Sequence, residues 1–388
     1  YAFVFKTTSD QYGRYSYIKV ISGRLTPDMS VVNARTGNIT KLGHLYTMCG
    51  KKATEVQEVC CGDIAAVSKL TDTRTNDSLC DPKHPVNLTA IPFPVANYTM
   101  AIAPKTKGQE DKVANGLVRL SEEDMTFHCV NNAETRQMVL TGTGDIQLSV
   151  LCAKLKDRFG VEVTLSPARV PYREKIRKKV KVEGKHKKQS GGHGQYGDVW
   201  IEFEPCDSEE LVFAENVFGG SVPKNFFPAV EKGLRDSVQH GVLASYPVVY
   251  LKATLVDGSY HPVDSSEMAF KTAASLAYKA GLAQANPVLL EPIGELHVIV
   301  PDSYTGDVMG DLNKRRGRVM GMNPVEAGEQ EIVAEVPMGE MGTYAIDLRS
   351  MTQGRGMFTY AFLRYEDTPP AVQEKAIAEA KQMQGDEE

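Results

Sequence analysis

Short apolar runs separated by glycines dominate the first part of the chain. The clearest runs lie at residues 17–21, 29–32 and 64–67, and no apolar stripe with helical spacing interrupts them. Short strands that alternate with turns are typical of small barrels and sandwiches. We therefore predict a β-barrel over residues 1–83, with a linker around Pro82–Pro85.

The pattern changes to mixed strands and helices over residues 86–167. One strand, one helix, two strands, a second helix and a final strand follow one another there. The helices carry apolar stripes formed by Val113, Leu117 and Leu120 and by Leu148, Leu151, Leu155 and Phe159. This βαββαβ order predicts a ferredoxin-like domain.

The same order of elements recurs over residues 287–366, so we predict a second ferredoxin-like domain there. Residues 168–286 form a middle α+β domain with helices near 227–239 and 265–284. Residues 367–388 are expected to form a C-terminal helix with an acidic tail. The fold class is therefore multidomain, an N-terminal β-barrel followed by three α+β domains.

Composition is that of an ordinary globular protein. The 388 residues are 42% hydrophobic and 24% charged, which excludes a disordered, collagen-like or coiled-coil chain. No apolar run reaches the roughly 18 residues that a membrane span needs, and we expect no secretory leader from these residues. The seven cysteines contain no C-x-x-C pair and predict buried, free thiols in the cytoplasm. Because Tyr1 reads like the middle of a strand, we expect the chain to be a piece of a longer protein.

The net charge of −5 conceals one strongly basic segment. Residues 169–188 hold ten Lys or Arg and two acids, a local charge of +8, so the remainder carries −13. Within it Lys175, Arg177, Lys179 and Lys181 alternate, which predicts one strand with a basic face. Such a face could follow a phosphate backbone. The alternative is a solvated edge strand that its lysines protect from aggregation.

Gly192–Gly197 satisfies the dinucleotide-binding pattern G-x-G-x-x-G. That mechanism needs an apolar strand before the loop and a helix after it. Here a lysine-rich segment precedes the loop, and the alternating residues 199–204 predict a strand after it. We therefore predict a loop between two strands, which would let backbone approach RNA closely or would simply be a flexible hairpin.

No catalytic or metal-binding pattern emerges from the rest of the sequence. The eight histidines are not spaced as metal ligands, and no G-x-S-x-G elbow occurs. The G-x-x-x-x-G-K-[ST] phosphate loop is also missing from these residues. The sequence thus predicts no catalytic residue and no cofactor or metal in this chain, which should not hydrolyse GTP alone.

Several longer motifs resemble one protein family. Ser190–Gly197 resembles the domain IV tip loop of translation elongation factor G, and Asp257–Phe270 resembles its second tip loop and following helix. Gly306–Gly317 and Asp347–Gly356 resemble domain V of that family.

The front of the chain extends the resemblance. Ser22–Leu25 and Cys61–Val67 resemble the domain II barrel of translational GTPases, so similarity runs in order through the whole chain. It implies domains II to V without the N-terminal GTPase domain, with a domain IV like ribosomal protein S5. GTP and magnesium would bind the missing domain.

The family uses GTP hydrolysis to move tRNA and mRNA through the bacterial ribosome. The resemblance implies a monomer that binds the ribosome and does not bind membranes. Domain IV would contact tRNA and mRNA at the decoding region, and domain V would face the large-subunit GTPase centre. The implied tip residues are Gly191, Gly192, His193, Gly194, Gln195, Tyr196, Tyr260 and His261. The implied candidates for rRNA contact are Lys175, Arg177, Lys179, Lys181, Lys185, Lys187, Lys188, Lys314, Arg315, Arg316 and Arg318.

Two positions depart from the family pattern as we know it. His193 stands where Arg is common, and Pro262 stands where an acid is usual. A paralogue that serves ribosome recycling or regulation is therefore an alternative, followed by a tetracycline ribosome-protection factor. A stand-alone RNA-binding module without a GTPase partner is a further alternative from a different class.

Overall fold

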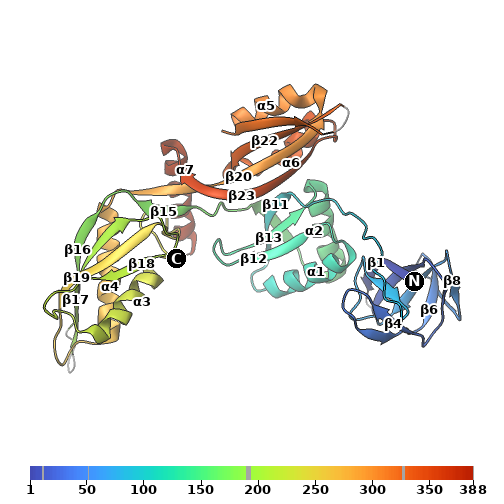
Figure 1. Ribbon diagram of the computed structural model, residues 1–388, viewed down its shortest axis with the longest axis horizontal. Helices are drawn as coiled ribbons and strands as arrows, with labels where there is room; N and C mark the ends of the chain where they lie inside the picture. The colour runs from blue at the N-terminus through green and yellow to red at the C-terminus, as the bar shows by residue number, and fades with distance from the viewer. Residues whose placement is uncertain (11–12, 51, 189–193, 326–327, 388) are drawn as a thin grey trace. The chain divides into compact units, whose positions relative to one another are not determined.

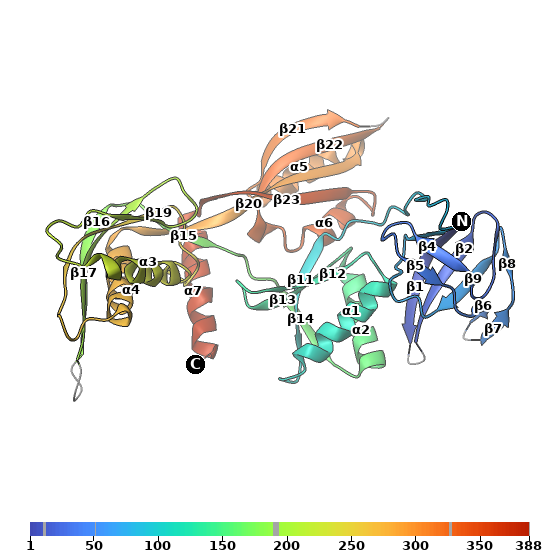
Figure 2. The same cartoon turned by 60° about the horizontal axis from the view of Figure 1, so that its bottom comes forward.

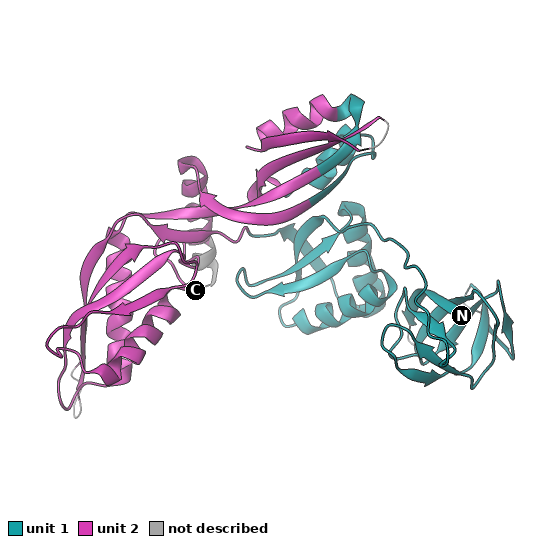
Figure 3. Cartoon of the chain, in the orientation of Figure 1, with its two compact units in different colours: residues 1–169, 298–304, 342–359 teal, residues 170–297, 305–341, 360–388 magenta. Residues whose placement is uncertain are grey.

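The computed structural model describes residues 1–10, 13–50, 52–188, 194–325 and 328–387. The chain divides into two compact units, coloured teal and magenta in Figure 3. The first unit holds residues 1–169, 298–304 and 342–359, and the second holds residues 170–297, 305–341 and 360–388.

The N-terminal domain is a β-rich half-barrel, in agreement with the predicted fold class. Eight strands form one sheet in the order β5-β4-β10-β1-β2-β9-β6-β7, and β3 pairs with β8 (Figure 1). Alternate residues of β2 point into one apolar core, as the period of a strand requires. The strands are β1 (Ala2–Asp10), β2 (Gly13–Val20), β3 (Arg24–Leu25), β4 (Ser30–Asn33), β5 (Ile39–Lys41), β6 (Leu45–Cys49), β7 (Lys52–Val56), β8 (Val59–Cys60), β9 (Ile64–Ser68) and β10 (Ser78–Cys80).

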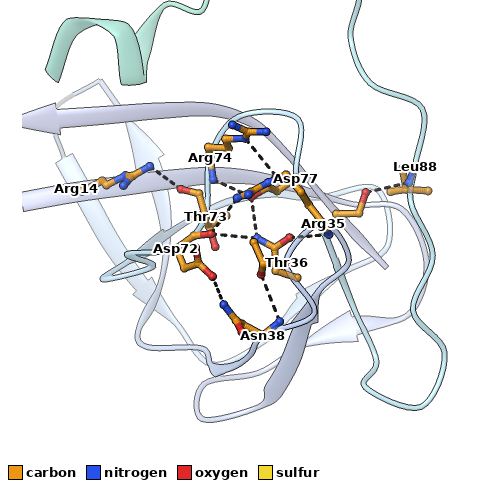
Figure 4. A network of polar contacts seen from close by, with 11 residues as sticks. Arg14, Arg35, Thr36, Asn38, Asp72, Thr73, Arg74, Asp77 and Leu88 are labelled. Carbon is orange, nitrogen blue, oxygen red and sulfur yellow. Dashed lines mark hydrogen bonds and ion pairs between the residues drawn. The ribbon is translucent and has the colours of Figure 1, made fainter. Parts of the chain in front are cut away.

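A polar network lies beside this core (Figure 4). The carboxylate of Asp77, 2% exposed, accepts bonds from Arg35 Nε at 2.7 Å and Asn33 Nδ2 at 2.7 Å. The backbone N–H of Arg74 donates to it at 3.0 Å. Burial would raise the pKa of Asp77, but the hydrogen bonds from Arg35, from the Arg74 N–H and from Asn33 together lower it. The carboxylate therefore stays charged and joins the segment of Asn33 and Arg35 to its own segment.

The first ferredoxin-like domain has the predicted βαββαβ order. Its sheet runs β12-β13-β11-β14, and the predicted stripes of both helices face one core, with Val113, Leu148 and Leu155 fully buried. Gly160 ends the second helix in a left-handed conformation (φ 60°), which glycine adopts without strain. The elements are β11 (Tyr98–Pro104), α1 (Glu110–Glu123), β12 (His128–Asn132), β13 (Gln137–Gly142), α2 (Asp145–Phe159) and β14 (Val163–Pro167).

The middle domain is a four-stranded sheet with the order β16-β17-β19-β18, on which α4 packs with α3 beside it (Figure 2). Close packing is possible because strand glycines face the alanine-rich side of α4. A Cβ on Gly184 would lie 2.1 Å from the carbonyl oxygen of Ala273, and one on Gly197 would lie 2.6 Å from that of Ala269. The elements are β16 (Val180–Lys188), β17 (Gln195–Pro205), β18 (Val212–Glu215), η1 (Lys224–Phe226), α3 (Phe227–Ser237), β19 (Leu251–Ser259) and α4 (Glu267–Gln284).

The second ferredoxin-like domain repeats the predicted order. Its strands run β20-β22-β21, with β23 also paired to β20, which is the strand arrangement of the first copy. A further helix, α7 (Pro370–Glu387), follows the domain. The elements are β20 (Pro287–Pro301), η2 (Asp302–Tyr304), α5 (Thr305–Lys314), β21 (Arg318–Pro324), β22 (Glu329–Pro337), η3 (Met338–Glu340), α6 (Tyr344–Met351) and β23 (Met357–Asp367).

The prediction of one continuous basic strand is wrong. β15 (Arg173–Ile176) pairs with β20, whereas β16 pairs with β17, so Lys175 and Lys181 lie in different sheets. The strand is interrupted because the backbone N–H groups of Arg177 and Lys178 both donate to the carbonyl oxygen of Ala285, at 3.0 Å each. The hydrogen bonds to the Ala285 carbonyl thus end the strand, although basic residues continue to alternate along the sequence.

The cysteines are free, but the expectation that they are buried holds only in part. Cys49, Cys60 and Cys61 are exposed, and Cys80 is buried. The three exposed thiols lie on short strands and turns of the half-barrel, where a small domain has little interior to offer. None of the helices in the described part of the chain is long and apolar enough to cross a membrane.

Candidate functional site

The predicted tip segments meet at one end of the middle domain. β16 pairs antiparallel with β17 from Val180↔Phe203 to Lys188↔Gln195, and β17 pairs antiparallel with β19. β16 and β19 therefore run in the same direction, and Lys188 and Ser259 end them at the same edge of the sheet (Figure 1). A strand follows the glycine motif, as predicted, so the helix that a dinucleotide site requires is not there.

Hydrogen bonds join the two segments. The backbone N–H of Gly194 donates to Asp264 Oδ1 at 3.0 Å, and that of Tyr196 donates to the Asp264 carbonyl at 2.8 Å. Ser265 Oγ donates to the carbonyl of Tyr196 at 2.9 Å and accepts the N–H of His261 at 2.8 Å. The start of β17 and the 260–266 loop thus form one bonded surface, which we call the tip.

His261 is held with one ring nitrogen turned inward. Its Nδ1 accepts the backbone N–H groups of Val263 at 3.3 Å and Asp264 at 3.2 Å. The side chain is 53% exposed, and its ring centroid lies 6.5 Å from that of Tyr196. Nε2 is therefore the nitrogen that an outside partner can reach. Tyr260, 48% exposed, precedes it on the same loop.

A chain of hydrogen bonds holds the Tyr196 side chain of the tip. The Tyr196 hydroxyl lies 2.7 Å from Ser259 Oγ, which donates to Asp198 Oδ2 at 2.6 Å. Lys185 Nζ lies 3.6 Å from the same carboxylate oxygen and 5.8 Å from the centre of the Tyr196 ring. Attraction to Asp198 raises the pKa of Lys185, so that lysine stays charged. These contacts fix the Tyr196 ring before any partner arrives.

Many of the predicted basic residues already have acidic partners within the protein. Lys175 and Arg177 form ion pairs with Asp367 at 2.5 and 2.6 Å. Lys179 pairs with Glu202 at 2.7 Å, so its charge is partly neutralised. The segment from 169 to 188 is therefore less available to phosphates than its +8 charge indicates.

Two lysines beside the tip have no acidic partner in the part of the chain that the structure describes. Lys187 and Lys188 end β16, are exposed, and have no ion-pair partner among the described residues. Lys181, at the other end of β16, is exposed too and lies over the ring of Trp200, with Nζ 5.7 Å from its centroid. Exposed lysines without an ion pair among the described residues therefore lie both beside the tip and away from it.

The second basic cluster belongs largely to the fold of its own domain. Arg315 Nε pairs with Asp311 at 2.7 Å, and Arg316 makes two bonds to Glu291 at 2.7 and 2.8 Å. Hydrogen bonding to Glu291 raises the pKa of Arg316. Arg318 binds Glu366 at 2.6 Å. Of the four predicted basic residues of this cluster, Lys314 alone is exposed and without an ion pair in the described part of the chain.

The predicted tip is only partly visible. Gly191, Gly192 and His193 lie outside the described residues, whereas Gly194, Gln195, Tyr196, Tyr260 and His261 are described. Sequence reasoning missed Asp264 and Ser265, which connect the two segments. Their signal was the Ser–Ser–Glu run before a helix, where Ser266 caps α4 by accepting the N–H of Ala269 at 3.2 Å. No group of His, Cys, Asp and Glu that could hold a metal ion occurs in the described ranges.

Comparison with protein families matches the chain in four consecutive parts. The families are elongation factor G domain 2 over residues 1–82, domain III over 92–167, domain IV over 168–286 and the elongation factor G C-terminus over 288–376.

A crystal structure of a protein from Thermus thermophilus is similar over 98% of the chain, with 38% identity and a TM-score of 0.84. The chain spans 57% of that protein, just over half its length. Together with the four family matches, this similarity shows that the chain belongs to the elongation factor G family of translation factors and contains its domains II to V.

Proposed function

We propose that the chain is the ribosome-binding arm of a factor that moves tRNA and mRNA through the bacterial ribosome. GTP hydrolysis would occur, with magnesium, in a GTPase domain outside these residues. The arm would work in the cytoplasm as part of a monomeric factor. The bonded tip is the observation that supports this proposal most directly.

A translocation factor must act on every codon, so its contacts should not depend on base sequence. Backbone, shape and stacking contacts meet that need, whereas hydrogen bonds to base edges do not. The tip offers an aromatic ring at Tyr260, an imidazole Nε2 at His261 and backbone at Gly194. These groups can contact the RNA backbone and stack on bases without distinguishing one base sequence from another.

The tip residues are held before a partner arrives. Tyr196 is fixed by Ser259 and Ser265, and His261 by its own loop. A preorganised surface loses less conformational entropy on binding. Lys187 and Lys188 would supply the long-range attraction to rRNA.

Ribosome recycling or regulation is the second candidate function. Pro262 stands within the 260–266 loop at a position where the family usually carries an acid, and His193 replaces a common Arg. Two substitutions in the sequence motifs of the tip segments would change contacts with tRNA or mRNA. That difference favours testing both activities side by side.

The first experiment measures binding of the 388-residue chain to purified ribosomes at several salt concentrations. Affinity should fall steeply with salt, and exchanging Lys187 and Lys188 for Gln should reduce the slope of log K against log salt by about 0.7 to 0.9 for each lysine. Lys179→Gln is the matched control, because Lys179 is paired with Glu202. Salt-independent binding, or none, would refute the proposal.

The second experiment uses the full-length parent with its GTPase domain and follows both mRNA movement and subunit splitting. His261→Ala should slow movement more than it weakens binding, and His128→Ala, an exposed histidine of the first ferredoxin-like domain, should change neither. Splitting without movement would assign the factor to recycling.

A further inference from the structure

A third loop reaches the tip end of the middle domain. β18 pairs parallel with β19, from Val212↔Lys252 to Glu215↔Leu255, so both strands run toward the tip end of the sheet, and β19 continues past the end of β18 to Ser259. Immediately after β18, the N–H of Asn216 donates to the carbonyl of Leu255 at 2.8 Å. The chain then runs through residues 216–222, which we call the third loop, before η1 begins.

Both ends of the third loop are fixed to the domain. Val217 packs against the apolar core, and Val222 is buried within it. Val222 lies against Gly258, since a Cβ on that glycine would be 2.5 Å from Val222 Cγ2. The residue after Gly258 is Ser259, whose hydroxyl contacts Tyr196 of the tip. The third loop is therefore a neighbour of the tip.

The middle of the loop presents a bare aromatic ring. Phe218 is 94% exposed, more than any other large hydrophobic side chain in the described part of the chain. Gly219 and Gly220 follow it with φ of 70° and 71°, a left-handed conformation that glycine adopts without strain. Val217 and Val222 pack in or against the apolar core of the domain, whereas the Phe218 ring does not. The whole ring is therefore free to contact a partner outside the protein.

We propose that Phe218 stacks on an unpaired nucleobase of ribosome-bound RNA and is part of the binding surface. This inference rests on the proposed function. RNA fits the site because the same edge of the sheet carries Tyr260, 48% exposed, and the exposed lysines Lys187 and Lys188. Exposed aromatic rings beside unpaired cations bind single-stranded nucleic acid through stacking and phosphate attraction. A phenyl ring has no polar atom, so the contact tolerates every base.

The first test places the photo-crosslinker p-benzoylphenylalanine at residue 218, 260 or 276 of the chain and irradiates each variant on purified ribosomes programmed with mRNA and tRNA. Leu276 on α4, 42% exposed, is the control position. RNA products from positions 218 and 260 but not from 276 support the inference. RNA products from 260 alone, or protein products from 218, overturn it and leave the proposed function standing. No RNA product from position 218 or position 260 overturns both the inference and the proposed function.

The second test separates stacking from a merely structural role. Phe218→Ala should weaken ribosome binding roughly tenfold, and Phe218→Trp should restore it, because a stacked aromatic ring is the interaction lost. The salt slope should stay unchanged, since no phosphate contact is removed. Leu276→Ala should not alter affinity. Equal weakening by Ala and Trp, or a changed salt slope, would overturn the inference.

Discussion

The carboxylate of Glu174 accepts the backbone N–H of Ala244 at 2.8 Å inside the second compact unit. It also accepts the N–H groups of Leu243 at 2.9 Å and Tyr246 at 3.3 Å, while its side chain is buried. No cation bonds to this acid among the described residues. The loop that follows α3 is therefore organised around a buried carboxyl group supported by backbone donors alone.

This arrangement predicts a pH-dependent loop. Burial raises the pKa of Glu174, and the backbone N–H groups only partly oppose that effect. A carboxyl whose pKa is raised on folding contributes stability that is complete below its unfolded pKa and is lost as pH rises through the folded pKa. Hydrogen exchange of residues 242–248, corrected for intrinsic rates, should show more opening at pH 7 than at pH 5.

Glu174→Gln should abolish that pH dependence, because glutamine does not titrate. Glu210→Gln, at an exposed position of the same domain, should leave it unchanged. An unaltered pH profile in the Glu174 variant would contradict the prediction.

Asp77→Asn should destabilise the half-barrel, because its buried carboxylate is the shared acceptor of Arg35, Asn33 and Arg74. Arg35 is partly exposed, which screens the pair, so we expect a loss of about 1–3 kcal/mol in the free energy of unfolding. The hydrogen bonds hold the pKa of Asp77 below its ordinary value against the effect of burial. Its stabilisation is thus present above the unfolded pKa and is lost in acid, as pH falls through the folded pKa.

Denaturant unfolding followed by hydrogen exchange within residues 1–80 would measure this change. Asp28→Asn is a suitable control, since Asp28 has φ of 63° and asparagine tolerates that conformation. Similar losses in both variants would show that the network adds little.

Gly184→Ala should destabilise the middle domain by roughly 1–3 kcal/mol through overpacking. Its added methyl group would meet backbone atoms of α4 at Ala273 and Ala277, which cannot rotate away. Gly310→Ala is the matched change in α5, where nothing lies within 4 Å, and it should be neutral or stabilising by up to about 1 kcal/mol. Thermal unfolding of the two variants tests the difference. If Gly184→Ala is as stable as the parent, α4 does not pack as closely as described.

Ser265→Ala should loosen the tip, because one hydroxyl accepts the N–H of His261 and donates to the Tyr196 carbonyl. Loss of both bonds should cost about 1–2 kcal/mol in local stability. Hydrogen exchange should therefore rise in residues 194–198 and 260–266. Thr272→Ala removes only a bond to the Met268 carbonyl within α4 and should leave tip exchange unchanged. Unchanged exchange in the Ser265 variant would mean that Asp264 alone holds the segments together.

Sequence periodicity predicted the helices and strands that are determined by residues close together in the sequence. The stripes of α1 and α2 were found because each helix buries residues three and four positions apart. The break in the basic segment was not found, since the Ala285 carbonyl that causes it lies about a hundred residues away. The alternation of basic residues over a short segment gives no information on a hydrogen bond to a residue so far along the chain.

The same limit applies to the candidate site. The family resemblance indicated the two tip segments, but not the bond by which Asp264 joins Gly194 across 70 positions of the chain. The family resemblance indicated Arg316 and Arg318 without revealing that Glu291 and Glu366 bind them. Phe218 carried no periodic signal, because its importance comes from exposure, which only the fold determines.

The placement of β15 has a mechanical consequence. The chain passes between the middle domain and the second ferredoxin-like sheet twice, once from β15 to β16 and once from α4 to β20. At that passage β15 and β20 are hydrogen-bonded neighbours, with Arg173 opposite Leu290 and Ile176 opposite Pro287. The two connections also meet outside the sheet, where the N–H groups of Arg177 and Lys178 both donate to the carbonyl oxygen of Ala285. The two crossings are therefore tied to each other by hydrogen bonds, so that neither can be displaced without breaking bonds to the other.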